Sequence, residues 1–155
     1  MKPTNLMSAV ALSATMLAAG PAAAAEQDNV MKTVRQWMDS LNQGDMKTAI
    51  AACAEETAIV DEFPPFEWHG KGTCAKWAAE LEAYNKQIGI TYGVTEAKPP
   101  RRVDISGNHA YAIIPVDYRF TRNGKVGAQI GALFTVALSK EQGSWLITGW
   151  AWSRP

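Results

Sequence analysis

The residues best suited to chemistry lie in one stretch, TAIVDEFPPFEWHGKG, which covers residues 57–72. It holds the adjacent carboxylates Asp61 and Glu62, and His69 follows Glu62 by seven residues. A carboxylate at the mouth of an apolar pocket can have its pKa raised by desolvation and then act as a general base. A nearby histidine would complete an acid and base pair. We therefore predict Asp61, Glu62 and His69 as candidate catalytic residues.

Each of these candidates also has a simpler interpretation. Neighbouring residues of a strand point to opposite faces, so only one of Asp61 and Glu62 should face a cavity and the other would be a solvated rim charge. A lone histidine beside a glycine is most often an exposed or structural residue. The other histidine, His109, starts a predicted strand, and no cluster has the spacing of metal ligands. We predict neither a metal nor another cofactor.

Large aromatic side chains from several predicted elements form the second group of candidates. A cavity lined by such rings, with a few polar groups, is the usual form of a small-molecule site. The alternative is that most of them fill an ordinary core. Pro64 and Pro65 should hold the rings on either side of them rigidly near the entrance. The predicted ligand-binding residues are Trp37, Phe63, Phe66, Trp68, Trp77, Tyr92, Tyr118 and Phe134.

The first half of the chain has the apolar spacing of helices. The pattern predicts three of them, over residues 29–43, 46–53 and 74–88. Asp45 and Thr73 are plausible N-caps, and Gly44 and Gly89 are natural stops. A brief β-prone run, residues 58–60, lies between the second and third helices and should end at the two prolines.

The second half has extended segments divided by turn signals. Asn123-Gly124 is the strongest of these signals for a hairpin. Helices gathered on one side of antiparallel strands define an α+β domain. We predict a cone of three N-terminal helices packed on one strongly curved, mostly antiparallel sheet. The predicted strands are 90–98, 101–106, 109–122, 125–140 and 144–153.

Alternation along the long strands predicts which side chains face the core. Trp145 and Ile147 should face the core, whereas Leu146, Trp150 and Trp152 should lie on the opposite face. Two tryptophans outside a core would leave an apolar patch that favours a homodimer through the outer sheet face. The other predicted core positions are Ala110, Ala112, Ile114, Val116, Tyr118, Phe120, Ile130, Phe134, Val136 and Leu138; Tyr111, Asp117, Arg119, Gln129 and Thr135 should form the polar outer face.

The first 25 residues differ in composition from the rest. A basic start at Lys2, an apolar run and a small-residue end are typical of a secretory signal peptide, cleaved after Ala25. The alternative, a membrane helix, fits poorly because the run is shorter than the ~20 apolar residues of a span. We predict a periplasmic or secreted protein, not held in a membrane after cleavage, with a single domain over residues 26–155.

Composition and cysteine content narrow the possible partners. With 15 basic and 15 acidic residues, the chain lacks the positive charge of nucleic-acid-binding proteins. Its two cysteines, Cys53 and Cys74, could form a disulfide in an oxidising compartment, which would contribute ~3 kcal/mol. The alternative is a pair of buried thiols.

Four short motifs carry a resemblance to a known family. They are LNQGD at residues 41–45, VDEFPP at 60–65, WHGKG at 68–72 and GSWLITGW at 143–150. Together with the element order, they resemble the nuclear-transport-factor-2-like (NTF2-like) superfamily, in particular its SnoaL-like and ketosteroid-isomerase-like branch. The resemblance implies a cone-shaped α+β fold, an apolar cavity between sheet and helices, and frequent homodimers. It does not imply one activity, since the superfamily hosts many.

The ketosteroid isomerases of that superfamily imply a specific catalytic set. Their carboxylate base falls on Glu62, with Asp61 beside it; their helix tyrosine falls on Trp37 and their strand aspartate near Ala132. Trp37 offers one indole donor and Ala132 offers none. The missing oxyanion donors argue against steroid-isomerase chemistry.

Three functions follow as hypotheses. The first is an exported SnoaL-like domain that binds an apolar small molecule in its central cavity. The second is an acid and base isomerase, dehydratase or cyclase acting on a polyketide-, steroid- or terpene-like substrate. The third is a non-catalytic, dimeric interaction module.

Overall fold

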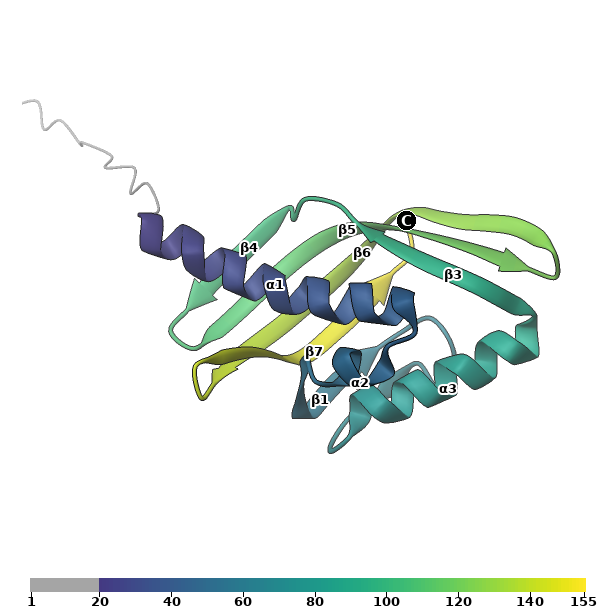
Figure 1. Ribbon diagram of the computed structural model, residues 1–155, viewed down its shortest axis with the longest axis horizontal. Coiled ribbons are helices and arrows are strands. Elements are labelled where there is room, and N and C mark those ends of the chain that lie inside the picture. The colour runs from purple at the N-terminus through teal and green to yellow at the C-terminus, as the bar shows by residue number, and fades with distance from the viewer. Residues whose placement is uncertain (1–19) are drawn as a thin grey trace, which may run out of the picture.

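The computed structural model describes residues 20–155, which fold into helices packed on a single sheet (Figure 1). Most of the predicted signal peptide, residues 1–19, therefore lies outside the described residues. The helices are α1 (Pro21–Gln43), α2 (Met46–Ile50) and α3 (Thr73–Ile88). The strands are β1 (Cys53–Val60), β2 (Glu67–Trp68), β3 (Ile90–Ala97), β4 (Arg102–Ser106), β5 (His109–Arg122), β6 (Lys125–Glu141) and β7 (Ser144–Ser153).

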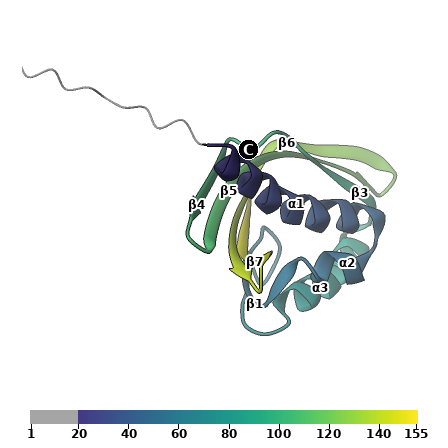
Figure 2. The ribbon, with the colours of Figure 1, turned by 60° about the vertical axis from the view of Figure 1, so that its left-hand side comes forward.

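The strands form one sheet in the order β2-β1-β7-β6-β5-β3, and β4 also pairs with β5. Only β1 and β7 run parallel among the strands described; the remaining pairs are antiparallel. Strands β3 and β4 lie one after the other along the same edge of β5. Pro99 and Pro100, between them, interrupt the ladder. The sheet curves around α1. Helices α2 and α3 lie on the same, concave side of the sheet (Figure 2).

The sequence located most of these elements correctly. Gly44 and Gly89 end α1 and α3 in left-handed conformation, and the Asp45 side chain caps α2 by accepting a hydrogen bond from the Thr48 amide at 3.1 Å. Asn123 and Gly124 form the predicted two-residue hairpin turn between β5 and β6. The α+β prediction of three helices on a curved, mostly antiparallel sheet is therefore confirmed.

Some boundaries differ from the prediction. The second helix stops at Ile50, because β1 starts at Cys53 and already pairs with β7 there. Helix α1 begins at Pro21, upstream of the predicted start, and residues 22–25 are exposed. Gly72, rather than Thr73, is the N-cap of α3. Strand β2 was missed because it has only two residues and pairs locally with the end of β1.

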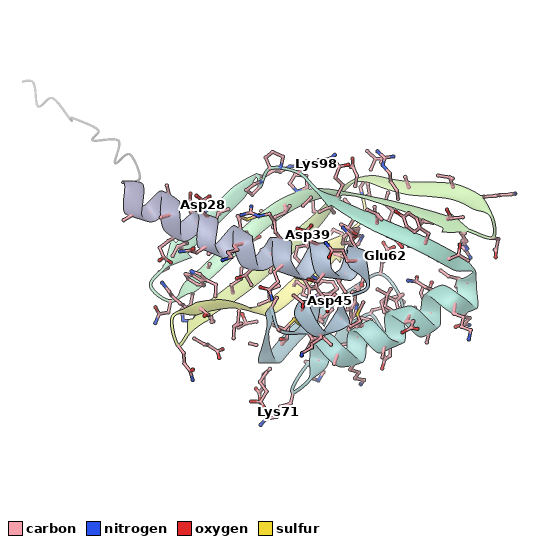
Figure 3. All side chains as sticks on the ribbon, viewed as in Figure 1. Asp28, Asp39, Asp45, Glu62, Lys71 and Lys98 are labelled. Carbon is pink, nitrogen blue, oxygen red and sulfur yellow. A yellow bond between two sulfur atoms is a disulfide. The ribbon has the colours of Figure 1, made fainter. Side chains whose placement is uncertain are left out.

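The core lies between α1 and the middle of the sheet. Val30, Val34 and Trp37 share the helix face that is turned inward, and each is at most 2% exposed. Charged residues of the same helix, such as Asp28 and Asp39, lie on the outside (Figure 3). The strand residues packed beneath this helix are Ala112, Ile114, Val136, Leu138 and Ile147.

A bulge in β6 reverses part of the predicted alternation. Gly131 has φ +78° and no partner in the register, since Val116 pairs with Ala132 and the next pair joins Asp117 to Ile130. The Gly131 amide donates to the Asp117 carboxylate at 2.9 Å, which holds the bulge in place. The predicted core residue Ile130 is consequently 51% exposed, and Gln129, predicted on the outer face, points inward.

A second bulge, at Thr148 in β7, corrects the assignment of the two C-terminal tryptophans. Leu138 pairs with Ile147 and Ala137 with Gly149, which leaves Thr148 as the extra residue. Trp150 is therefore 5% exposed in the core, and Trp152 lines a cavity. The prediction of an outer tryptophan patch is wrong, because the extra residue turns both rings inward. A homodimer through the outer sheet face stays a prediction without these two side chains.

One covalent link ties the helices to the sheet. Cys53 at the start of β1 and Cys74 in the first turn of α3 form a disulfide, which decides between the two alternatives left by the sequence. By the chain-entropy estimate, a loop of 21 residues corresponds to about 3 kcal/mol. Within residues 20–155, no helix is long and apolar enough to cross a membrane.

Candidate functional site

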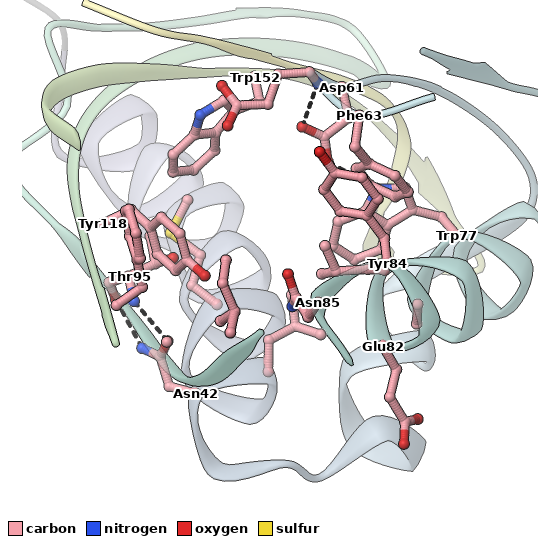
Figure 4. Close-up of a pocket in the computed structure, with 18 of the residues that line it drawn as sticks. Asn42, Asp61, Phe63, Trp77, Glu82, Tyr84, Asn85, Thr95, Tyr118 and Trp152 are labelled. Carbon is pink, nitrogen blue, oxygen red and sulfur yellow. Dashed lines mark hydrogen bonds between the residues drawn. The ribbon is translucent and has the colours of Figure 1, made fainter. Parts of the chain in front are cut away.

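A cavity of about 1010 Å³ lies between the C-terminal half of α1, helix α3 and the sheet. Figure 4 shows it as a hollow with Tyr118 and Trp152 on one side and Phe63, Trp77 and Tyr84 on the other. Apolar and aromatic side chains make up most of its wall.

Asp61 is the most buried acidic group of this wall. It directly follows the last residue of β1, where its amide donates to the carbonyl of Phe66 at 3.0 Å. The Glu62 amide donates to its Oδ1 at 2.7 Å, and Trp77 Nε1 donates to its Oδ2 at 2.9 Å. Both donors are neutral, so each oxygen has a hydrogen bond but the carboxylate has no cationic partner among the described residues within salt-bridge distance.

Burial gives Asp61 an unusual affinity for protons. Desolvation raises the pKa of its carboxyl from the ordinary 3.8 to about 6, although the hydrogen bonds from Glu62 and Trp77 oppose this rise. The neighbouring Glu62 charge adds to the rise, and Arg154 slightly counters it. A carboxyl with such a pKa can both accept and return a proton near neutral pH.

Glu62 occupies the cavity rim in a chain of polar contacts. Gln129 Nε2 donates to Glu62 Oε1 at 2.5 Å, and Arg154 Nε donates to the other carboxylate oxygen. Trp152 Nε1 in turn donates to Gln129 Oε1 at 2.9 Å. Glu62 thus has a cationic partner, unlike Asp61. Its charge is balanced by Arg154 at the surface.

Tyr118 lies opposite Asp61 across the hollow (Figure 4). Burial raises the pKa of its hydroxyl, and the charges of Glu62 and Asp61 raise it further, so the phenol stays protonated and can donate. Gly93 of β3 makes room for the ring, because a Cβ there would lie 2.5 Å from the tyrosine oxygen. No hydrogen bond from this hydroxyl to another described residue is present.

At the opposite end of the cavity, two side-chain hydrogen bonds join α1 to β3. The Asn42 side chain of α1 donates to the carbonyl of Thr95 at 2.7 Å and accepts from its amide at 2.8 Å. These two bonds, visible in Figure 4, replace the missing neighbour of edge strand β3. They hold the end of α1 against the sheet and keep this wall of the cavity in position.

Only some of the predicted site residues line the cavity. Asp61 and Glu62 both line the cavity, because β1 ends at Val60 and strict alternation no longer applies. His69 is exposed and outside the lining, so the expected pair of Glu62 and His69 does not form there. Of the predicted aromatic residues, Trp37, Phe63, Trp77, Tyr92, Tyr118 and Phe134 line the cavity.

The other two predicted aromatic residues lie elsewhere. Phe66 is 55% exposed and outside the described lining, so it does not guard the cavity with Phe63 as expected. Trp68 is buried behind the wall, where its ring centroid lies 4.8 Å from that of Phe63 and its Nε1 donates to Glu80 at 2.6 Å. It supports a lining residue rather than facing the cavity.

Several lining residues were missed by sequence reasoning. Gln129 and Trp152 were assigned to the outer face because neither bulge was recognised. Gly131 was the available signal for the first bulge, since an isolated glycine in a strand often marks one. Tyr84 lies within the third predicted helix, but it was not predicted to line a cavity. Arg154 follows the last strand and carried no signal.

The positions equivalent to the oxyanion donors of ketosteroid isomerases hold a tryptophan and an alanine here, not a tyrosine and an aspartate. Trp37 packs with its ring centroid 5.5 Å from that of Trp77 and 6.1 Å from that of Trp150. Ala132 is fully buried in β6. The phenols that line the cavity with Asp61 are those of Tyr84, Tyr92 and Tyr118, which come from α3, β3 and β5 rather than from α1. No group of metal-binding side chains gathers within residues 20–155.

Structural comparison places this architecture among known folds. An NTF2-like superfamily protein from Salmonella enterica has a TM-score of 0.71 and 14% identity, over 85% of this chain and 92% of that one. A ketosteroid isomerase-like protein from Erwinia carotovora has a TM-score of 0.67 and 17% identity, over 83% and 95%. A hexachlorocyclohexane dehydrochlorinase has a TM-score of 0.71 and 10% identity, over 84% and 86%.

The chain therefore has the NTF2-like fold, as the four sequence motifs predicted. No protein-family model matches the sequence, and no curated protein does either. At such low identities the likeness defines the fold alone, so the function must be argued from the cavity and its side chains.

Proposed function

We propose that this protein binds a largely apolar small molecule in the cavity between α3 and the sheet. The observation that carries the proposal is the cavity itself, about 1010 Å³ with a mainly aromatic wall and few polar groups. This is large enough for a ligand of several fused rings, and such cavities are the usual form of small-molecule sites. Asp61 and Tyr118 supply one acceptor and one donor to orient the ligand.

A ligand screen tests this function. We expect thermal-shift and calorimetric measurements with steroid, polyketide and terpene-like compounds to show binding to the wild-type protein. Leu81→Trp should abolish it, because Leu81 lines the cavity and a larger ring would occupy the space. Ala83→Trp is the matched control, since Ala83 is exposed on the same helix. Absence of binding to the wild type, or equal binding to Leu81→Trp, would contradict the proposal.

A second candidate, proton-transfer catalysis, is favoured by the position of Asp61. Its pKa of about 6 and its place in the wall suit a general base, with the Tyr118 hydroxyl as a donor to developing negative charge. The dehydrochlorinase with the same fold indicates that elimination chemistry is compatible with this architecture. His69 has no part in this candidate, because it is exposed outside the cavity.

Isotope exchange separates catalysis from binding. A compound found in the screen would be incubated with the protein in deuterated water, and its acidic C–H positions followed by NMR. Exchange should disappear in Asp61→Asn and persist in Glu67→Gln, a matched change at an exposed carboxylate outside the described lining. If no bound compound exchanges faster than in buffer, the protein binds without proton transfer.

Export is part of the same proposal. The disulfide between Cys53 and Cys74 supports an oxidising compartment. The first polar anchors of α1 to the sheet are also placed just after the predicted cleavage point: Glu26 accepts hydrogen bonds from Lys140 at 3.0 Å and from Trp145 at 3.0 Å. Edman sequencing of the periplasmic or secreted protein should begin at Glu26; an intact start at Met1 would contradict export by cleavage.

A further inference from the structure

Of the three carboxylates that line the cavity, Glu62 is paired with Arg154, Glu82 is exposed to solvent, and Asp61 is desolvated without a counter-ion. Its two hydrogen-bond donors, the Glu62 amide and the Trp77 indole, are neutral. The closest candidate for a partner, Arg154, donates instead to Glu62. Removing a carboxylate from water without pairing it is costly, and such a charge is stabilised by a cation brought in by a ligand.

The rings that share the cavity wall with this carboxylate offer faces suited to a cation. Tyr118 and Trp152 meet nearly at right angles, with an interplanar angle of 86° and ring centroids 6.2 Å apart. Phe63 and Tyr84 stack on the other side of the hollow, with centroids 5.1 Å apart (Figure 4). Aromatic faces attract ammonium groups, most strongly where water is excluded.

The positively charged side chains of the wall are either exposed or already paired. Arg122 and Lys86 line the cavity but are exposed, and Arg122 Nε donates to the carbonyl of Ile88 at 2.9 Å. Arg154 is neutralised by Glu62. These groups could attract an anionic ligand at the mouth, so a carboxylate-bearing compound is the competing possibility.

We infer that the ligand of this cavity is an apolar amine, with its ammonium group held between the Asp61 carboxylate and the rings of Tyr118 and Trp152. This inference rests on the proposed function, because it specifies the class of molecule that the same cavity binds. The ion pair and the ring faces would supply the charge selectivity, while the apolar wall accommodates the body of the molecule.

Three probes with one carbon skeleton test the inference: diphenylbutylamine, diphenylbutanol and diphenylbutyrate. Isothermal titration calorimetry at pH 7.5 should show that the amine binds at least about tenfold more tightly than the alcohol, and that the acid binds most weakly. In Asp61→Asn the preference for the amine over the alcohol should shrink to about twofold or less. Glu67→Gln, the exposed matched control, should keep it.

The outcomes distinguish the two proposals. If none of the three probes and none of the screened compounds binds, the proposed binding function fails. If the probes bind with equal affinity, or if the alcohol or the acid binds best, the cavity binds small molecules and the inference of a cationic ligand is overturned. A preference for the amine that survives in Asp61→Asn would also overturn it.

A measurement on the wild-type protein keeps the test independent of the folding of Asp61→Asn. The other titratable or charged groups that line the cavity with Asp61 are Glu62, Glu82, Tyr84, Lys86, Tyr92, Tyr118, Arg122 and Arg154. Phenols, guanidinium groups and alkylamines keep their protonation state from pH 5 to 7.5. Because the Asp61 pKa is about 6, affinity for the amine should fall about tenfold at pH 5, while affinity for the alcohol stays constant. A pH-independent affinity for the amine would contradict the inference.

Discussion

The same three strands, β5, β6 and β7, build two different interiors. At the filled end, α1 covers the sheet and the side chains between them are almost inaccessible to solvent. At the hollow end, where α3 faces the sheet, the inward side chains surround the cavity instead. The filled end includes Ala112, Ile114, Val136, Leu138 and Ile147. The hollow end includes Tyr118, Phe120, Gln129 and Trp152 of these strands, together with Asp61 after β1.

The difference arises where the strands are interrupted. Uninterrupted alternation on the filled end puts small and branched residues beneath α1, and they pack without a large gap. The bulges at Gly131 and Thr148 then turn Gln129 and Trp152 toward the inside. The filled end contributes stability, whereas the hollow end carries groups such as Asp61 whose burial costs stability. The two ends should therefore respond differently to substitution.

The largest expected contrast comes from truncating an apolar side chain at each end. Leu138→Ala should reduce the free energy of unfolding by about 3 kcal/mol, because Leu138 is 1% exposed and the filled end cannot collapse around the gap. Phe120→Ala is the comparison at the hollow end and should cost about 1 kcal/mol, since the half-buried ring already borders a cavity. Urea denaturation measures both. Equal costs would mean that the hollow end is as tightly packed as the filled end.

The next largest effect is the pH dependence caused by Asp61. Its folded pKa of about 6 exceeds the ordinary 3.8, so the folded state binds more protons between these values. Its stabilising contribution is therefore present below pH 3.8 and is lost as pH rises through 6, a loss of about 2–3 kcal/mol. Comparing the wild type with Asp61→Asn by urea denaturation from pH 4 to 7 isolates this contribution.

The same comparison has a clear contrary outcome. The stability of the wild type relative to Asp61→Asn should fall as pH rises through this range. Asparagine itself will have a constant cost, because its side-chain nitrogen cannot accept a hydrogen bond and either the Glu62 amide or the Trp77 indole loses its acceptor. A difference that does not vary with pH, or that varies in the opposite direction, would show that Asp61 is not destabilised as an ion.

The smallest expected effect tests the bulge that separates the two ends. Gly131→Ala should reduce stability by about 1 kcal/mol, because its φ of +78° disfavours a side chain while the space around a Cβ is open. Gly131→Asn should recover part of this loss, since asparagine tolerates the left-handed region better. Thermal unfolding of the three proteins measures the order. If alanine and asparagine cost the same, backbone conformation is not what requires glycine here.

Local sequence signals predicted most of the fold. The helical spacing of Val30, Val34 and Trp37, the stops at Gly44 and Gly89 and the hairpin at residues 123–124 depend on interactions within a few residues. The four motifs then indicated the NTF2-like fold, which structural comparison confirms. The stretch from residue 57 to 72 was also a correct guide to the cavity, since Asp61, Glu62 and Phe63 line it.

The inward or outward direction of several site residues could not be predicted in the same way. One extra residue in a strand reverses the inward and outward directions of the residues beyond it. Because neither bulge was recognised, the predicted directions were wrong for Ile130, Gln129, Trp150 and Trp152. Whether a residue pairs or bulges depends on the partner strand. The signal of Gly131 was local, but its consequence for Gln129 was not.

The sequence by itself determined the helices, the turns, the curved sheet and the stretch that borders the site, because short-range periodicity and turn chemistry suffice for them. Only the tertiary structure decided that Asp61 is desolvated while Glu62 is paired with Arg154, that Tyr118 and Trp152 face the same hollow, and that His69 does not. The physical reason is that desolvation and pairing depend on groups from β1, α3, β5, β6 and the C-terminal end, which come together only when the chain is folded.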